Sequence, residues 1–222
     1  MSRETGKQCE RRMQKADKVT KLNLEMWDSR AETYDRCLRF TRWSQKKLVS
    51  VSELGENPHL LDLGCGTGWA VLYAASGANG HGEFYGIDIS SKMIEKAEAN
   101  SANYRNVHFY EANAEELPFE NGFFGHIICS NAFHHYSNPE KVVGEASRVL
   151  KPHGRVYILD ITADGLLTSI LDRLARKLER GHVKVYSTKD YQILFEKAGL
   201  LYVSSKSILP TWKIHIAEKV LS

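Results

Sequence analysis

A chain of 222 residues is long enough to bury a sizeable core and predicts one domain with attachments. Its net charge of +3 is too small to indicate nucleic-acid binding by itself, and no run of about 18 apolar residues or signal peptide occurs. We therefore expect a cytoplasmic protein without a transmembrane segment. The four cysteines are far apart, which argues against a CxxC zinc site and against a disulfide framework.

Residues 1 to about 50 are expected to form helices that precede the first strand. We predict an N-terminal helical cap over residues 1–50 and a main domain over residues 51–222. Basic residues cluster between positions 11 and 21 and again between 173 and 180, and we interpret both clusters as solvated helix faces.

From residue 59 onward, short β-branched or aromatic runs alternate with helical patterns, which predicts βαβ units and the α/β class. Seven strands are expected to form one sheet. They are 59–63, 83–88, 107–112, 126–131, 155–161, 201–207 and 212–218.

The first predicted strand runs into a glycine loop, in the sequence HLLDLGCGTGWAV at 59–71. Gly64, Gly66 and Gly68 lack Cβ atoms, so a ligand can approach the main chain closely. Trp69 occupies the position of the lysine in a Walker phosphate loop and of the third glycine in a dinucleotide fingerprint, so neither motif fits. The carboxylate of Asp62 would repel a pyrophosphate but attract an ammonium or sulfonium group, which favours a cationic ligand.

Two later helices carry start signals. Asn138 before Pro139 predicts the start of a helix that continues to about residue 150. Ser187 with Asp190 three positions later resembles a capping box, and Gly199 suits the end of that helix.

An amphipathic helix within residues 162–185 is inserted between the fifth strand and the capped helix. We expect this segment to pack as a lid over an acceptor pocket. A helix lying on a membrane surface is the alternative, because its apolar and basic faces together suit quinone or lipid substrates at a bilayer.

Five motifs carry a family resemblance over roughly residues 25–200. In chain order they are DLGCGTG, YGIDIS, EANAEELPF, HIICSNAFHHYSNPE and RVLKPHGRVYILD. This series resembles the class I S-adenosylmethionine (SAM) dependent methyltransferases, most of all the small-molecule branch that includes quinone and sterol methyltransferases. The resemblance implies a Rossmann-like, doubly wound, seven-stranded sheet, mostly parallel with an antiparallel last strand and helices on both faces. It also implies SAM as cofactor, S-adenosylhomocysteine (SAH) as product, and no metal.

Asp88 ends the second predicted strand, where a carboxylate can accept hydrogen bonds from both ribose hydroxyls. The alternative is that Asp88 caps the following helix, a role that Ser90 can fill. By resemblance Ile89 packs on the adenine face with Met93 nearby, although a core role for Met93 stays open.

The third motif has Asn113-Ala114 where relatives usually have Asp-Ala, and the asparagine carbonyl can still accept from the adenine amino group. By resemblance the main chain near Asn131 meets the methionine ammonium. Gly125 replaces an aspartate common in relatives, and the sequence offers no physical account of it. The expected cofactor-binding residues are Asp62, Gly64, Cys65, Gly66, Gly68, Asp88, Ile89, Met93, Asn113, Ala114 and Asn131.

The candidate catalytic residues are His134, His135 and Tyr34. A histidine near neutral pH can take a proton from a phenol, hydroxyl or acidic carbon during methylation. Adjacent histidines do not readily point the same way, and we expect His134 to face the pocket; alternatively both only line a wall. By resemblance Tyr34 closes over the sulfonium, and Arg30 or Arg36 either holds the methionine carboxylate or lies on the surface.

We expect methyl transfer to a small organic acceptor. An RNA or protein methyltransferase and a non-catalytic SAM-binding regulatory protein stay open as alternatives, although no NPPY-like motif or RNA-binding appendage is found and no nucleic-acid partner is expected. The sequence does not decide which atom is methylated, whether the protein touches a membrane peripherally, or whether it is a monomer or a homodimer.

Overall fold

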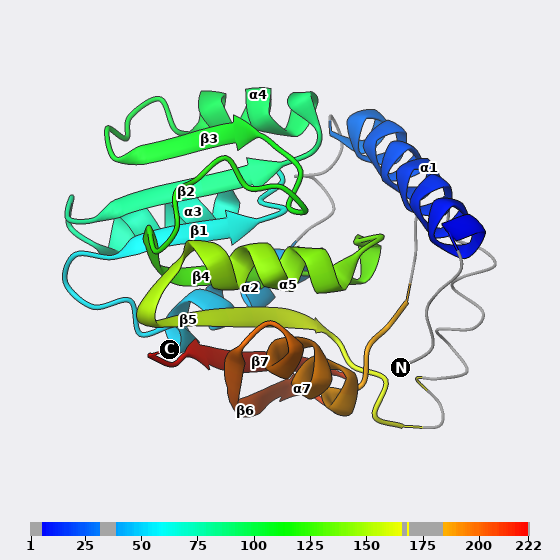
Figure 1. Cartoon of the computed structure of the whole chain (residues 1–222). Coiled ribbons are helices and arrows are strands. Elements are labelled where there is room, and N and C mark those ends of the chain that lie inside the picture. Colours follow the sequence, from blue (N-terminus) through cyan, green and yellow to red (C-terminus); the bar gives the residue numbers. More distant parts are fainter. Residues whose placement is uncertain (1–5, 32–38, 166–167, 169–183, 222) are drawn as a thin grey trace.

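The computed structural model describes residues 6–31, 39–165, 168 and 184–221. Seven strands form one sheet in the order β3-β2-β1-β4-β5-β7-β6 (Figure 1). The strands are β1 (His59–Leu63), β2 (Glu83–Asp88), β3 (Val107–Glu111), β4 (Phe124–Ser130), β5 (Leu150–Ile161), β6 (Leu200–Leu209) and β7 (Trp212–Lys219).

The pairing of the strands confirms the predicted sheet. The pairs among β1 to β5 are parallel, whereas β7, the last strand in the chain, is antiparallel to both of its neighbours. β5 begins at Leu150, five residues before the predicted start at residue 155. Leu150 pairs with Phe124, and the register shifts before Arg155 pairs with His126, so β5 includes the residues that were expected to follow a helix.

Helices cover both faces of the sheet (Figure 1). One buried cluster joins α5 and α7 to Leu61 and Ile127, and a second joins α2, α3 and α4 to Leu60 and Ile128. Successive strand residues therefore enter opposite clusters, as the pleat requires. The helices are α1 (Gly6–Arg30), α2 (Arg39–Val51), α3 (Trp69–Gly77), α4 (Ser91–Asn100), α5 (Pro139–Val149) and α7 (Thr188–Lys197), with a 3-10 turn, η2 (Phe133–His135).

Both predicted helix starts are confirmed. The Asn138 side chain accepts a hydrogen bond from the Lys141 N–H, with Pro139 as the first residue of α5. At α7 the capping box is complete, because Ser187 accepts from the Asp190 N–H and Asp190 accepts from the Ser187 N–H. These caps satisfy N–H groups that the helices leave unpaired.

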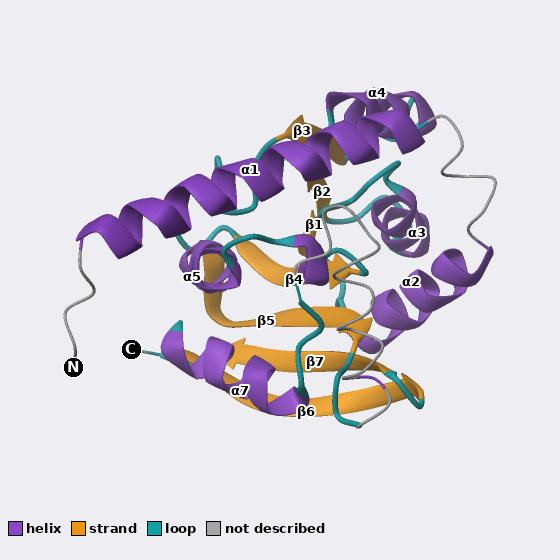
Figure 2. Cartoon of the chain, turned by 90° about the vertical axis from the view of Figure 1, so that its right-hand side faces the viewer, coloured by secondary structure: helices purple, strands orange, loops and turns teal. Residues whose placement is uncertain are grey.

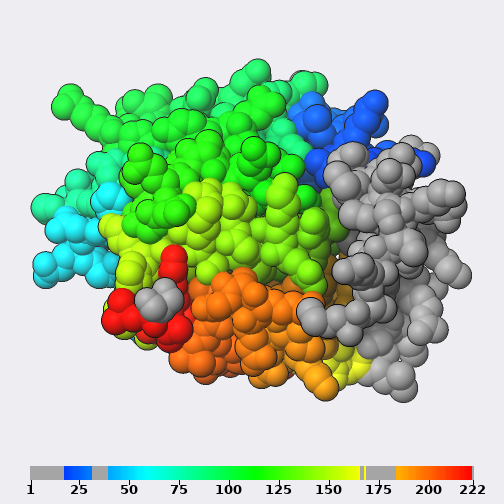
Figure 3. Space-filling view, in the orientation of Figure 1, coloured from blue at the N-terminus to red at the C-terminus, as the bar shows by residue number. Residues whose placement is uncertain are grey.

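α1 lies across the carboxyl edge of the sheet, in front of β1 and β2, between the ends of α4 and α5 (Figure 2). The described side chains of α1 pack against the region that contains α4 (Figure 3). The strand order reverses between β1 and β4. In α/β sheets, ligands bind at the carboxyl edge beside such a reversal.

Within the described ranges, no helix has the length and apolar character needed to cross a membrane. The predicted lid over 162–185 falls largely on residues outside the described ranges, and the division into a cap and a main domain stays a prediction.

Candidate functional site

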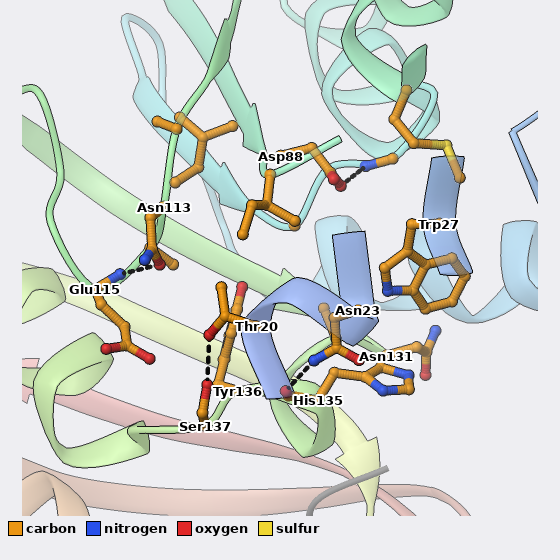
Figure 4. A pocket seen from close by; sticks show the side chains of 18 of the residues that line it. Thr20, Asn23, Trp27, Asp88, Asn113, Glu115, Asn131, His135, Tyr136 and Ser137 are labelled. Carbon is orange, nitrogen blue, oxygen red and sulfur yellow. Dashed lines mark hydrogen bonds between the residues drawn. The ribbon is translucent and has the colours of Figure 1, made fainter. Parts of the chain in front are cut away.

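A cavity opens at the carboxyl edge of the sheet beneath α1 (Figure 4). About 750 Å³ of space free of protein atoms lies within it, counting its open mouth. Its walls come from α1, α4 and the segments that follow β1, β2, β3 and β4. The lining residues are Thr20, Asn23, Trp27, Gly64, Gly66, Ile87, Asp88, Ile89, Met93, Ala112, Asn113, Ala114, Glu115, Ser130, Asn131, Ala132, His135, Tyr136 and Ser137.

The glycine loop fits closely between its neighbours. A Cβ on Gly64 would lie 2.8 Å from the Ala132 Cβ, and one on Gly68 would lie 2.5 Å from the Phe109 ring. Both glycines have positive φ angles, of 72° and 82°. Gly64 therefore lets the loops after β1 and β4 approach each other, and Gly68 lets α3 begin against β3. Only Gly64 and Gly66 of the three border the cavity.

Asp62 is buried behind this loop instead of standing at the mouth of the cavity. Its exposed fraction is 1%, and neither carboxylate oxygen has a hydrogen-bond partner among the described residues. Burial and, secondly, the nearby Asp88 raise the pKa of Asp62 well above its usual range. A buried carboxylate without a partner is unfavourable, and a cation that donates hydrogen bonds would relieve it. The residues present therefore fit a ligand with a positive charge, whereas a phosphate would add to the repulsion.

Asp88 lies on the cavity wall at the end of β2 (Figure 4). Its two oxygens accept from the N–H groups of Gly66 at 2.9 Å and Ser90 at 3.0 Å. Burial raises the pKa of Asp88, and these two hydrogen bonds oppose that shift. Ser90 is the N-cap of α4, accepting from the Met93 N–H at 3.2 Å, so the capping alternative for Asp88 is wrong.

Four of the residues expected around an adenine ring border the cavity: Ile89, Met93, Asn113 and Ala114. Met93 is also fully buried, so it combines a wall position with a core position. Asn113 uses its side-chain oxygen to accept from the Glu115 N–H at 3.0 Å, which fixes the turn after β3. Cys65 is buried away from the cavity, and burial raises the pKa of its thiol well above the usual value.

Asn131 follows β4 with a positive φ of 56° and borders the cavity. Its N–H donates to the Leu159 carbonyl at 2.8 Å, and its amide nitrogen donates to the Ser130 hydroxyl at 3.1 Å. The amide oxygen is buried and has no hydrogen-bond partner in the described parts of the chain. A ligand that donates hydrogen bonds suits this wall as well.

The two histidines take different positions. His135 borders the cavity, with its ring perpendicular to the Trp27 ring at 5.2 Å between centroids, whereas His134 does not border it. The preference for His134 as the residue facing an acceptor pocket stays a prediction. The Asp160 carboxylate lies 2.8 Å from His134 Nδ1 and holds that ring toward β5. The two histidine rings are in contact, with centroids 4.0 Å apart.

Asp160 was missed in the sequence. It is 1% exposed and also accepts from the N–H groups of His134 at 3.0 Å and Ile161 at 2.8 Å. Burial alone would raise its pKa, but the His134 ring and the N–H donors reverse that effect and lower it below the usual value. The available signal was its place near the end of a parallel strand, where polar side chains gather at one edge.

The residues of α1 that line the cavity were also missed. The Thr20 and Ser137 hydroxyls are 2.7 Å apart, and the Asn23 amide nitrogen donates to the His135 carbonyl at 2.7 Å. Nothing local marks these positions, because α1 precedes β1 by almost thirty residues and its role depends on where it docks. Tyr34 and Arg36, which we proposed for this region, lie outside the described residues, and the Arg30 guanidinium lies over the Trp27 ring at 5.6 Å.

The departure from the family pattern at Gly125 is remote from the site. Gly125 lies at the start of β4, at the opposite edge of the sheet, and a Cβ there would meet nothing closer than the His59 carbonyl at 4.0 Å. Its replacement of an aspartate therefore does not alter the cavity. Where residues are described, no three His, Cys, Asp or Glu side chains are grouped as metal ligands.

Comparison with known proteins bears on this site. A family model described as a methyltransferase domain matches residues 54–199. The uncharacterized methyltransferase YcgJ of Bacillus subtilis is 32% identical over 159 residues, which are 70% of this chain and 62% of that protein. A demethylmenaquinone methyltransferase of Thermotoga maritima is 34% identical over 151 residues, which are 65% of this chain and 63% of that protein. The chain thus spans less than two thirds of both relatives.

Solved structures share the fold. The crystal structure of YcgJ superposes with a TM-score of 0.70 over 81% of this chain and 99% of that chain, at 23% identity. A 1,6-didemethyltoxoflavin-N1-methyltransferase of Burkholderia thailandensis, solved with bound 1,6-didemethyltoxoflavin and SAH, gives a TM-score of 0.75 over 93% of this chain and 91% of that chain, at 15% identity.

Proposed function

This chain belongs to the class I SAM-dependent methyltransferases, and on that premise we propose that it moves the methyl group of SAM to a small organic acceptor. The observation that carries the proposal is the Asp62 carboxylate, buried without a hydrogen-bond partner in the described chain, behind a glycine loop at the switch point of the sheet. That combination favours a cationic donor over a nucleotide's phosphates.

The cavity residues divide into three groups in this proposal. Ile89, Met93 and Asn113 hold the adenine, and Asp88 accepts from the ribose hydroxyls. Asp62 and the segment at Asn131 receive the methionine ammonium, since both present buried acceptors that lack partners among the described residues. When bound, SAM supplies an activated methyl group on a positively charged sulfur. The chain's own contribution is to orient the two reactants and to exclude water.

His134 and Asp160 form the proposed proton acceptor. A carboxylate that accepts from Nδ1 fixes the tautomer with hydrogen on Nδ1, so Nε2 becomes the basic nitrogen. We assign to Nε2 the removal of a proton from an acceptor O–H, N–H or acidic C–H group. His135 borders the cavity instead and supports the reactants through its ring. Tyr34 as a cover for the sulfonium and residues 162–185 as a lid over the acceptor stay predictions.

Two measurements test the function. Calorimetry with SAM, SAH and NADH is expected to detect binding of the first two only. Transfer of a labelled methyl group from SAM is then measured into panels of small hydroxylated and quinone-like molecules, RNA and protein. Labelling of RNA or protein alone would exclude a small acceptor, and binding of SAH without transfer to any panel would favour the regulatory alternative. Tight NADH binding without SAH binding would overturn the proposal entirely.

A further inference from the structure

α1 is fastened to the loops that form the cavity, although it lies outside the segment matched by the family model. Inside the cavity wall, the Thr20 hydroxyl meets the Ser137 hydroxyl, and Asn23 donates to the His135 carbonyl. Outside that wall, Asp28 accepts from the Ser90 hydroxyl at 2.5 Å, and Lys96 donates to the Ala31 carbonyl at 2.7 Å. The helix therefore bridges the segments that follow β2 and β4.

Among the described side chains of α1, Asn23 has a buried polar atom without a hydrogen-bond partner. Its exposed fraction is 6%, it borders the cavity, and its amide oxygen has no hydrogen-bond partner within the described ranges (Figure 4). The orientation of the amide is fixed, because a carbonyl such as that of His135 only accepts and the nitrogen must face it. The oxygen is then the group left for a donor in the cavity.

A buried acceptor without a partner is uncommon and unfavourable, so its place on a ligand wall indicates a ligand that donates. SAM and SAH carry such donors in both halves, namely the ribose hydroxyls and the ammonium. The other partnerless acceptors near this cavity, on Asp62 and Asn131, are of the same kind. Three acceptors from separate elements thus point to one donor-rich ligand.

We propose that α1 is part of the cofactor site and that the Asn23 amide oxygen accepts a hydrogen bond from bound SAM or SAH. The same amide transmits this contact to the main chain of His135, so cofactor occupancy tightens α1 against the loops after β2 and β4. The inference rests on the proposed function and adds to it a binding residue from outside the matched methyltransferase segment.

The test is calorimetric affinity for SAH in variants of the full chain. Asn23→Ala is expected to weaken SAH binding about tenfold, the effect of losing one buried hydrogen bond. Asp28→Ala loosens α1 at a contact outside the cavity wall, and Glu25→Ala alters an exposed position of the same helix. Glu25→Ala is expected to bind SAH within about twofold of the wild type, and Asp28→Ala is expected to lose less SAH affinity than Asn23→Ala. Equal loss in Asn23→Ala and Asp28→Ala would overturn the proposal, because docking of α1 alone would then explain it.

A second variant separates the two ends of the amide. Asn23→Asp keeps an acceptor oxygen but loses the donor to His135, so it is expected to bind SAH better than Asn23→Ala does. If Asn23→Asp and Asn23→Ala lose the same SAH affinity, the effect comes from the amide nitrogen that donates to His135. That result would reject the acceptor role of the amide oxygen. Thermal unfolding of each variant without ligand verifies that the chain is folded.

Binding of 5′-methylthioadenosine, which lacks the amino-acid portion, shows which donor Asn23 meets. If Asn23→Ala loses affinity for both 5′-methylthioadenosine and SAH, Asn23 contacts the ribose. If it loses affinity for SAH alone, Asn23 contacts the ammonium. Hydrogen exchange gives an independent readout: SAH is expected to slow exchange over residues 18–30 in the wild type and much less in Asn23→Ala. Unchanged affinity and unchanged protection would reject the proposal, whereas a wild type that binds no SAH would reject the proposed function itself.

Discussion

The Asp62 carboxylate is unfavourable to the folded chain when no cation is bound. It is fully buried, and burial together with Asp88 raises its pKa. For an acid whose pKa is higher in the folded state, the stability contribution is complete below the unfolded pKa, about 4, and is lost as pH rises through the folded pKa. At neutral pH, then, the group that suits a cationic ligand also lowers the free energy of unfolding.

Asp62→Asn is expected to separate these two effects. Without ligand it raises the free energy of unfolding at pH 7 by about 1–3 kcal/mol, because the amide avoids burying a charge, and the gain disappears near pH 4. SAH affinity falls about tenfold or more, because a charge-assisted hydrogen bond is lost. Thermal unfolding at both pH values and calorimetry measure the two changes. Glu111→Gln, an exposed carboxylate at the end of β3, is the control; SAH affinity unchanged by Asp62→Asn would contradict the ammonium assignment.

Asp160→Asn tests the pairing with His134. The amide does not hold the imidazole in the tautomer with a basic Nε2, so kcat is expected to fall about 100-fold or more. SAH affinity should stay within about twofold, because Asp160 does not border the cofactor cavity. His134→Ala should lose as much activity as Asp160→Asn, and His135→Ala provides the comparison. Wild-type kcat in His134→Ala, with SAH binding intact, would discard the proton-acceptor role.

Asp160 has the opposite pH dependence from Asp62. Its pKa is lowered in the folded state, so its stabilising contribution is present above the unfolded pKa and is lost as pH falls through the folded pKa. The difference in unfolding free energy between wild type and Asp160→Asn is therefore expected to shrink below about pH 4. Denaturant unfolding at pH 7 and pH 3 measures it, and a difference that grows in acid would contradict the ionised state of Asp160.

The position of a side chain was predictable where it lies at the end of a strand. Asp88 and Asn131 end predicted strands and Asn113 follows one, and all three border the same cavity, because the carboxyl ends of parallel strands meet at one edge. Asp160 lies near the end of a predicted strand and gave the same signal, but its pairing with the His134 ring depends on a contact between distant parts of the sequence. Asn23 gave no such signal, because its surroundings depend on where α1 docks.

At the scale of an element, α3 depends on the glycine that precedes it. Gly68→Ala combines the strain of a positive φ with a Cβ 2.5 Å from the Phe109 ring, and is expected to cost at least about 2 kcal/mol. Gly144→Ala is the matched control, because it lies inside α5 with nothing within 4 Å of a new Cβ, and should stabilise by about 0.5–1 kcal/mol. Denaturant unfolding measures both changes. A Gly68→Ala variant as stable as the wild type would contradict the steric account.

Strand ends were predictable where a local signal marks them. β1 and β2 have the predicted bounds, since the glycine loop and the Ser90 cap stop them. The start of β5 was wrong because Leu150 belongs to the sheet through its pairing with Phe124 across a register shift. His153 takes a positive φ of 61° within this stretch. Its sequence, with Pro152 and Gly154, resembles a turn, and only long-range pairing makes it a strand.

On the scale of the whole molecule, the cavity draws on segments from Thr20 to Ser137, so its ligand connects parts of the chain that are far apart in sequence. The two apolar clusters on opposite faces of the sheet hold the strands whose carboxyl ends meet there. A ligand at this edge should therefore stabilise the chain globally instead of only locally, because unfolding of any of these segments would release it.

SAH at about 100 times its dissociation constant is expected to raise the free energy of unfolding by about 2.7 kcal/mol and the melting temperature by roughly 5–11 °C. The shift should grow with the logarithm of SAH concentration, as linkage requires, and should be smaller in Asp62→Asn at the same concentration because its affinity is lower. NADH at the same concentration is the control and should give no shift, since the negative charge of Asp88 on the cavity wall and of Asp62 behind it would repel the pyrophosphate. A shift with NADH that matches or exceeds the SAH shift would mean that the cavity selects phosphates, and the charge argument on which the cofactor assignment depends would fail.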